Sequence, residues 1–255
     1  MNVDFTLNLS VMLLSLSLLL QSFEMLNISS KVGAHSPWSW NHVRNDFAHW
    51  PSFFLFSFDH LYEENFKFLV LTQIILTLCL LWEPHIVIFF LIMTYFLIAL
   101  RFRGNFNGGS DAMTMVTLVS LTFAFQKTSI GFYLLAFHCT LSYFMAGMVK
   151  LRNKSWRSGL ALQTFLTHSN YAIPSKIQKW TNQKSWMILG SWIVILFECS
   201  FPLVWLFPKL TTYYVVAASL FHVINYFCLG LNRFVFTWIA SYPALLFCTQ
   251  NYNLL

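Results

Sequence analysis

Long apolar runs, separated by short polar segments, set the pattern along the chain. Eight runs can be counted: Phe5–Leu26, Phe66–Trp82, Pro84–Leu100, Ala112–Phe125, Ile130–Val149, Trp186–Phe207, Thr212–Leu231 and Phe234–Thr249. A helix that spans a bilayer needs about 20 residues, with a range of about 17–25. The pattern therefore predicts an all-α fold: a polytopic integral membrane helical bundle of about eight transmembrane helices.

The polar segments between these runs differ in length. Only Glu83 and Pro84 separate the second run from the third, which predicts a tight helical hairpin. The long segment from Asn27 to Asn65 is rich in aromatic residues and is expected to lie at the membrane interface. The segment Leu151–Ser185 contains an amphipathic stretch that is expected to lie on the membrane or dip into it. With no internal repeat and no linker, residues 1–255 are predicted to form a single domain.

Composition supports a membrane protein and excludes several other classes. The apolar residue types make up 57% of the chain and only 9% is charged, against about a quarter in soluble domains. Such a chain cannot cover a water-facing surface, so a soluble enzyme and a disordered chain are excluded. The few basic residues sit in loops rather than in a basic groove, so no nucleic-acid partner is predicted, and the bilayer is the expected environment. The five cysteines fall in apolar segments and the histidines lack metal-ligand spacing, so no metal site is predicted.

Basic residues are distributed unevenly over the loops. If eight helices alternate across a bilayer, thirteen of the fifteen Lys and Arg residues fall on one side. The two on the other side are Lys127 and Lys209. Positive charge is retained on the cytoplasmic side, so the sequence predicts a multi-pass protein of the cell membrane with both termini outside.

Two ionisable residues are predicted deep in the membrane, where a charge is costly and often functional. Glu198 lies thirteen residues after Ser185, and His138 lies thirteen residues before Leu151, so the two are expected at similar depth. They are predicted to form a hydrogen-bonded pair. That pair is either a structural clasp between helices or part of a proton-transfer or substrate-binding site.

Three further polar residues are expected in the same bundle. His222 is in the middle of an apolar run, with Asn225 one turn later. Lys150 ends its run and is either a base or an anchor whose ammonium reaches the interface. Asp111 opens another run, where it either acts at a site or only caps a helix. The topology places Lys150 and Asp111 at the same membrane face, with His222 about a third of the way in.

Three motifs carry a resemblance to a known family. Tyr143-Phe-Met-Ala-Gly-Met-Val-Lys-Leu151, followed by Trp156 and Gly159, resembles the central signature of the HTTM family. Asn107-Gly-Gly-Ser-Asp111 and Phe221-His222-x-x-Asn225 with Pro243 are similar to two supporting motifs. The resemblance covers about residues 101–247 and is closer to short bacterial members, such as the sporulation-delaying protein B type, than to the animal vitamin K-dependent γ-glutamyl carboxylase.

The resemblance implies roles for individual residues. In the carboxylase, the lysine at the position of Lys150 is regarded as the base that deprotonates vitamin K hydroquinone, so a reduced quinone is the cofactor that the resemblance suggests. It also implies catalytic roles for Asp111 and His222, and substrate binding by Asn225, Tyr143 and Trp156. The catalytic histidine that the carboxylase has near the start of its fourth helix is missing here, because Gly109, Ser110 and Asp111 stand in that region. Carboxylation of glutamate is therefore not carried over.

Two classes of function follow from these observations. One is an integral membrane enzyme that modifies a peptide, quinone or lipid at Lys150, Asp111 and His222, with carboxylase-like lyase or ligase chemistry suggested by the resemblance only. The other is a non-catalytic membrane subunit that matures, exports or gives immunity to a secreted peptide, together with a companion protein.

The charge distribution yields a testable topology. Reporter fusions at Met1 and Leu255 should give an extracytoplasmic signal and a fusion at Lys154 a cytoplasmic one, because the basic loops stay inside. A cytoplasmic signal at Leu255 would contradict the eight-helix count or the orientation.

Overall fold

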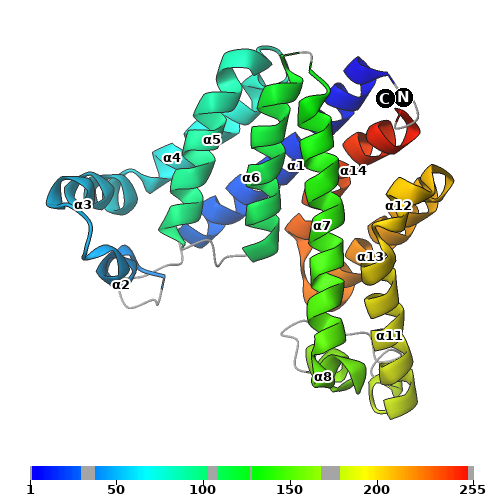
Figure 1. The fold of residues 1–255 in the computed structure, drawn as a ribbon. Coiled ribbons are helices and arrows are strands. Elements are labelled where there is room, and N and C mark those ends of the chain that lie inside the picture. The colour runs from blue at the N-terminus through cyan, green and yellow to red at the C-terminus, as the bar shows by residue number, and fades with distance from the viewer. Residues whose placement is uncertain (1, 30–37, 103–107, 127, 168–178, 252–255) are drawn as a thin grey trace. The chain divides into compact units, whose positions relative to one another are not determined.

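The computed structural model describes residues 2–29, 38–102, 108–126, 128–167 and 179–251, and every element in these ranges is a helix (Figure 1). Seven of the eight predicted apolar runs each correspond to one helix, and the run Trp186–Phe207 is divided between α11 (Lys184–Ser200) and the short helix α12 (Leu203–Leu206). The helices are α1 (Val3–Ser29), α4 (Phe66–Cys79), α5 (Pro84–Arg101), α6 (Gly108–Ala124), α7 (Ile130–Arg152), α11 (Lys184–Ser200), α13 (Thr211–Leu229) and α14 (Asn232–Asn251). The all-α prediction is confirmed.

Four helical segments are long and apolar enough to cross a membrane. They are Val3–Ile28, Pro84–Arg101, Ile130–Arg152 and Pro208–Leu229. The helix Phe66–Cys79 is apolar but shorter. α14 is long enough, but it is less apolar and buries twelve of its residues, as an interior helix does. The chain is thus a helical membrane protein, while the count of about eight spans stays a prediction.

Exposed side chains on these helices support a lipid environment. Large apolar residues such as Phe68, Ile86 and Phe227 are each more than 65% exposed. Apolar surface of this size is unusual on a soluble monomer, whereas lipid tails solvate it without cost.

The contacts divide the chain into two compact units. The N-terminal unit is Leu7–Gly131, and the C-terminal unit is Phe132–Leu255 together with Met1–Thr6. The single domain that the sequence predicts for residues 1–255 would contain both units, and it stays a prediction.

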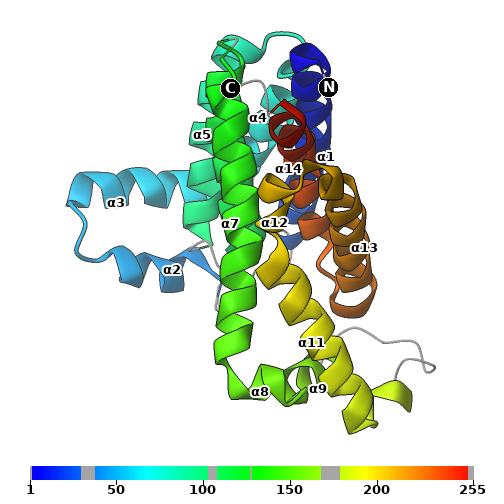
Figure 2. The same ribbon diagram turned by 45° about the vertical axis from the view of Figure 1, so that its right-hand side comes forward.

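In the N-terminal unit, α4 and α5 pack as the hairpin that the sequence predicts at Glu83 and Pro84. α4 ends in a turn before Pro84, which occupies the first position of α5, where its missing N–H costs no helical hydrogen bond. α6 packs on α5. The long aromatic segment folds into α2 (Trp40–Val43), η1 (Arg44–Phe47), α3 (Ser52–Asp59) and η2 (His60–Glu64). Figures 1 and 2 both show α3 extending away from α5 and crosswise to it.

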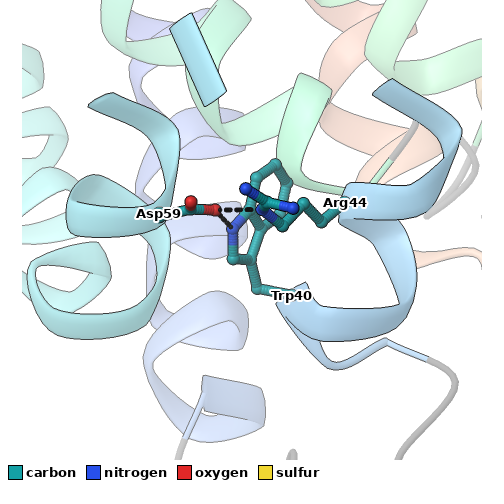
Figure 3. Close-up of polar contacts among 3 residues, drawn as sticks. All are labelled: Trp40, Arg44 and Asp59. Atoms are coloured by element: carbon teal, nitrogen blue, oxygen red, sulfur yellow. Dashed lines mark hydrogen bonds and ion pairs between the residues drawn. The ribbon is translucent and has the colours of Figure 1, made fainter. Parts of the chain in front are cut away.

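A charged clasp holds α2 against α3. The Nε–H group of Arg44 and the indole N–H of Trp40 both donate to the same oxygen of Asp59, each at 2.7 Å (Figure 3). Trp40 itself is buried in an aromatic and aliphatic cluster that includes Tyr62 and Phe66. Asp59, which is not part of this cluster, therefore holds the indole ring of Trp40 in one orientation within it.

In the C-terminal unit, two short helices follow α7. α8 (Lys154–Arg157) and α9 (Leu160–Thr167) lie at the end of α7 and pack against the first turns of α11 (Figure 2). Gly159 has a φ of +77°, and a Cβ atom there would lie 2.6 Å from the backbone nitrogen of Ile188. Glycine is therefore required at the turn that joins α8 to α9. After α11, α12 (Leu203–Leu206) and η3 (Pro208–Leu210) lead into α13, which packs along α14.

The clasp around Asp59 should loosen in acid. The hydrogen bond from Arg44, together with the one from Trp40 and the charge of Arg44, holds the pKa of Asp59 below its usual value. The stabilisation is present above the unfolded pKa of about 3.9 and is lost as the pH falls through the lower folded value. Amide hydrogen exchange in α2 should accelerate below about pH 4 in the wild type.

Asp59→Asn should exchange faster already at neutral pH and should lose that acid dependence. Glu63→Gln, at an exposed acidic residue close by, is the control and should behave as the wild type. Identical exchange profiles for Asp59→Asn and the wild type would contradict the role of the clasp.

Candidate functional site

An ion pair joins α7 to α11 in the C-terminal unit. The Nζ atom of Lys150 lies 2.8 and 2.7 Å from the two carboxylate oxygens of Glu198. The side chain of Glu198 is 3% exposed and that of Lys150 is 17% exposed. The ring of Trp156 lies 5.2 Å from Nζ, within range of a cation–π contact. The motif that contains Lys150 thus contributes to a largely buried ion pair, and the indole ring of Trp156 lies next to its ammonium group.

Gly147 allows this pair to form. A Cβ atom at Gly147 would lie 2.6 Å from the backbone nitrogen of Cys199, so α7 and α11 approach backbone to backbone. Close approach through small residues is typical of helix packing in membranes.

The predicted pair between Glu198 and His138 is wrong. Both carboxylate oxygens of Glu198 bind Lys150, whereas His138 is half-buried on α7 and has no hydrogen bond to Glu198 in the described ranges. The prediction assumed that α11 begins level with the end of α7. Instead the first turns of α11 pack beyond that end: the hydroxyl of Ser191 donates to the carbonyl of Trp156 at 2.5 Å. Glu198, two turns further on, then meets the last turn of α7.

A second polar cluster joins three helices of the same unit. The hydroxyl of Tyr143 on α7 lies 2.7 Å from Nε2 of His222 on α13 and 2.7 Å from the hydroxyl of Tyr242 on α14. His222 is 3% exposed. The rings of Trp238 and Phe221 lie 5.2 and 5.4 Å from its imidazole.

The other ring nitrogen of His222 has no hydrogen-bond partner among the described residues. Its Nδ1 atom is buried and makes no hydrogen bond in the part of the chain that the structure describes. If Tyr143 donates to Nε2, a neutral imidazole carries its proton on Nδ1, which is then an unused donor. If Nε2 donates to Tyr143, Nδ1 is an unused acceptor. In either case one buried imidazole nitrogen is left for another group.

One face of α7 connects the ion pair to the histidine cluster. Tyr143, Gly147 and Lys150 are spaced four and three residues apart and so share a face. Lys150 and Tyr143 are separated by about 10 Å along the helix axis. Phe201, three residues after Glu198, stacks on Tyr143 with ring centroids 4.1 Å apart and planes at 9°. Lys150 and the partner of His222, Tyr143, therefore lie along one face of α7, and Lys150 and His222 are not hydrogen-bonded to each other within the described residues.

Asp111 belongs to the N-terminal unit. It lies in the first turn of α6, is 7% exposed, and accepts hydrogen bonds from Tyr95 at 3.1 Å and from Gln21 at 3.5 Å. Gln73 donates in turn to Gln21 at 3.2 Å. The position in the first turn suits the helix dipole. The role predicted for Asp111 beside Lys150 and His222 stays a prediction.

Sequence reasoning missed several members of these clusters. For Tyr242 the signal in the sequence is its place directly before Pro243 of the third motif. For Gln21 and Gln73 the signal is an amide side chain inside an apolar run. Asn225 is half-buried on α13 and has no hydrogen bond within the described ranges. Among the described residues, no group of three His, Cys, Asp or Glu side chains is arranged to hold a metal ion.

The apolar helices and the buried polar clusters define a helical membrane protein. The HTTM domain matches residues 82–252, well over half of the chain, and the chain belongs to the HTTM family. The match contains Lys150, Glu198, His222 and Tyr242. No curated protein and no solved structure matches the chain.

The Lys150–Glu198 pair should show strong energetic coupling. Lys150→Met and Glu198→Gln should each lower the free energy of unfolding by about 1–3 kcal/mol, because each leaves one partner buried alone. The double variant should be more stable than the Glu198→Gln variant, since it removes both charges. Thermal or denaturant unfolding in detergent measures the coupling.

His138→Leu is the control for this cycle. It should change stability less than Glu198→Gln, because no hydrogen bond to Glu198 is lost. Additive effects in the cycle, or a larger loss for His138→Leu, would contradict the pairing.

Proposed function

We propose that this HTTM protein is an integral membrane enzyme that modifies a peptide, quinone or lipid, with Lys150 as its base. The observation that carries the proposal is the largely buried pair of Lys150 and Glu198. Ionisable groups are costly in a membrane and are retained there mainly for function.

Glu198 gives Lys150 a route to the neutral amine. A lysine acts as a base only after it has lost its own proton, and a carboxylate oxygen at 2.7 Å can accept that proton. The neutral lysine then takes a proton from the substrate, such as the hydroxyl of a reduced quinone, and leaves a substrate anion beside an ammonium group. The opposite charge stabilises that anion.

His222 supports the binding of a substrate oxygen. Its unpartnered Nδ1 atom can donate to a carbonyl or accept from a hydroxyl, depending on the tautomer. Asn225 and Trp156 are the further binding residues in this proposal. A carboxylase-like reaction with a reduced quinone is the chemistry that the family suggests.

A non-catalytic role has one observation in its favour. The carboxylate of Glu198 takes both of its hydrogen bonds from Lys150, and Trp156 covers the ammonium group, as in a static clasp between helices. In that case the protein is a multi-pass cell-membrane subunit that helps to mature, export or give immunity to a secreted peptide.

Lys150→Arg separates the two roles. Arginine keeps the charge and the ion pair but cannot lose its proton at working pH. Under the enzyme proposal the variant should be inserted normally and should lose activity by about 10²–10⁴-fold. The readout is mass spectrometry of peptides, quinones and lipids from cells that express either form, with a catalytic product defined by comparison with cells that lack the protein.

Lys154→Arg is the matched control, because Lys154 is exposed four residues further along. It should leave the product at the wild-type level. Wild-type product levels in the Lys150→Arg variant would refute a base at this position and leave the clasp.

A further inference from the structure

Arg101, the last residue of α5, is a buried cation that forms no ion pair with any described residue. It is 6% exposed, and neither its Nε nor its Nη1 atom has a hydrogen-bond partner in the described part of the chain. Its guanidinium carbon lies 5.2 Å from the ring of Phe102, 5.8 Å from Trp40 and 5.9 Å from Phe66. We name these three rings and Arg101 the arginine cage.

No acidic side chain pairs with Arg101 in the described ranges. All nine acidic residues fall within the described ranges, and none of them forms an ion pair with Arg101 there. The nearby acidic side chain is Glu63, which acts on Arg101 electrostatically but is exposed on η2. The buried hydroxyl of Tyr62 donates instead to the carbonyl of Leu97 at 2.8 Å.

Contacts with the aromatic rings compensate for only part of the cost of burying the guanidinium group. Cation–π contacts attract the guanidinium through its faces, but its N–H groups point outward in the plane and need acceptors. Buried donors without acceptors are rare and costly in folded proteins. The cage therefore holds the cation while leaving its hydrogen-bonding edge unused.

The position of Arg101 indicates which anion fits. It ends the candidate membrane span Pro84–Arg101, at the depth where an apolar core gives way to lipid headgroups. Because α4 and α5 form a hairpin, the start of α4, which contributes Phe66 to the cage, lies at the same end. Arginine favours phosphate through paired N–H donors, and basic pockets between membrane helices bind anionic headgroups.

We propose that the arginine cage is a binding site for a phosphate group, which pairs with the free N–H donors of Arg101. This phosphate belongs either to an anionic phospholipid headgroup or to a free phosphate ion. The site lies within the N-terminal unit and is independent of the chemistry proposed for Lys150.

The test measures phosphate binding to the purified, full-length protein. Native mass spectrometry and thermal unfolding would be carried out in detergent with phosphatidylglycerol, phosphatidylcholine or inorganic phosphate. The wild type should retain phosphatidylglycerol or bind phosphate, with a matching rise in Tm, and should gain less from phosphatidylcholine. Stabilisation by phosphatidylglycerol alone identifies a lipid headgroup, and stabilisation by inorganic phosphate identifies a free ion.

Three variants decide the outcome. Arg101→Gln should weaken binding by about tenfold or more, since charged hydrogen bonds are lost. Arg101→Lys keeps the charge without the paired donors and should weaken it less. Lys67→Gln removes an exposed charge at the same end and should bind as the wild type does.

The proposal is overturned if no phosphate-bearing ligand stabilises the wild type, or if Arg101→Gln binds as the wild type does. It is also overturned if Lys67→Gln loses as much affinity as Arg101→Gln, which would indicate general surface attraction. Should Arg101→Gln fail to fold, unchanged affinity of Arg101→Lys overturns it. None of these outcomes depends on whether Lys150 is a base.

Discussion

The contact between Lys150 and Glu198 is the interaction on which the C-terminal unit depends. Two charges can be buried in an apolar helix bundle only if each supplies the counter-charge of the other. That requirement fixes the rotation of α7 and α11 about their axes, and Gly147 fixes their separation. The same rotation turns Tyr143 toward His222. The signature around Lys150 therefore specifies how these helices pack.

Buried charged side chains have different surroundings in the N-terminal unit. Arg101 is surrounded by aromatic rings, and Asp111 accepts hydrogen bonds from Tyr95 and Gln21. One of the rings, the indole of Trp40, is held from the other side by Asp59. A carboxylate outside the core thereby orients an aromatic ring against a cation inside it.

The helices could be predicted from the sequence because a bilayer requires continuous apolar runs, and these are local features. The hairpin at Glu83 and Pro84 could be predicted for the same reason. The partner of Glu198 could not, because it depends on how far α11 extends beyond the end of α7. That offset is set by the packing of α8 and α9, with Gly159 and Ser191 as its contacts, and no periodicity along a single helix encodes it. Tyr242 was missed since a tyrosine in an apolar run shows no partner until three helices are assembled.

The shared hydroxyl of Tyr143 has a consequence for what can occupy the space beside His222. It has one proton and two neighbours, so the direction of the hydrogen-bond chain from Tyr242 to His222 can reverse as a unit. When Nε2 carries the proton of the neutral imidazole, Nδ1 is an acceptor; when the proton is on Nδ1, Nδ1 is a donor. The change from donor to acceptor requires that Nδ1 give up a proton and that the tyrosine pair take one up, and it moves no heavy atom. Each of the two tautomers can therefore make one hydrogen bond through Nδ1, to a hydroxyl in the first case and to a carbonyl in the second. If His222 binds a substrate oxygen as proposed, the reduced and the oxidised form of one molecule would each find a partner there.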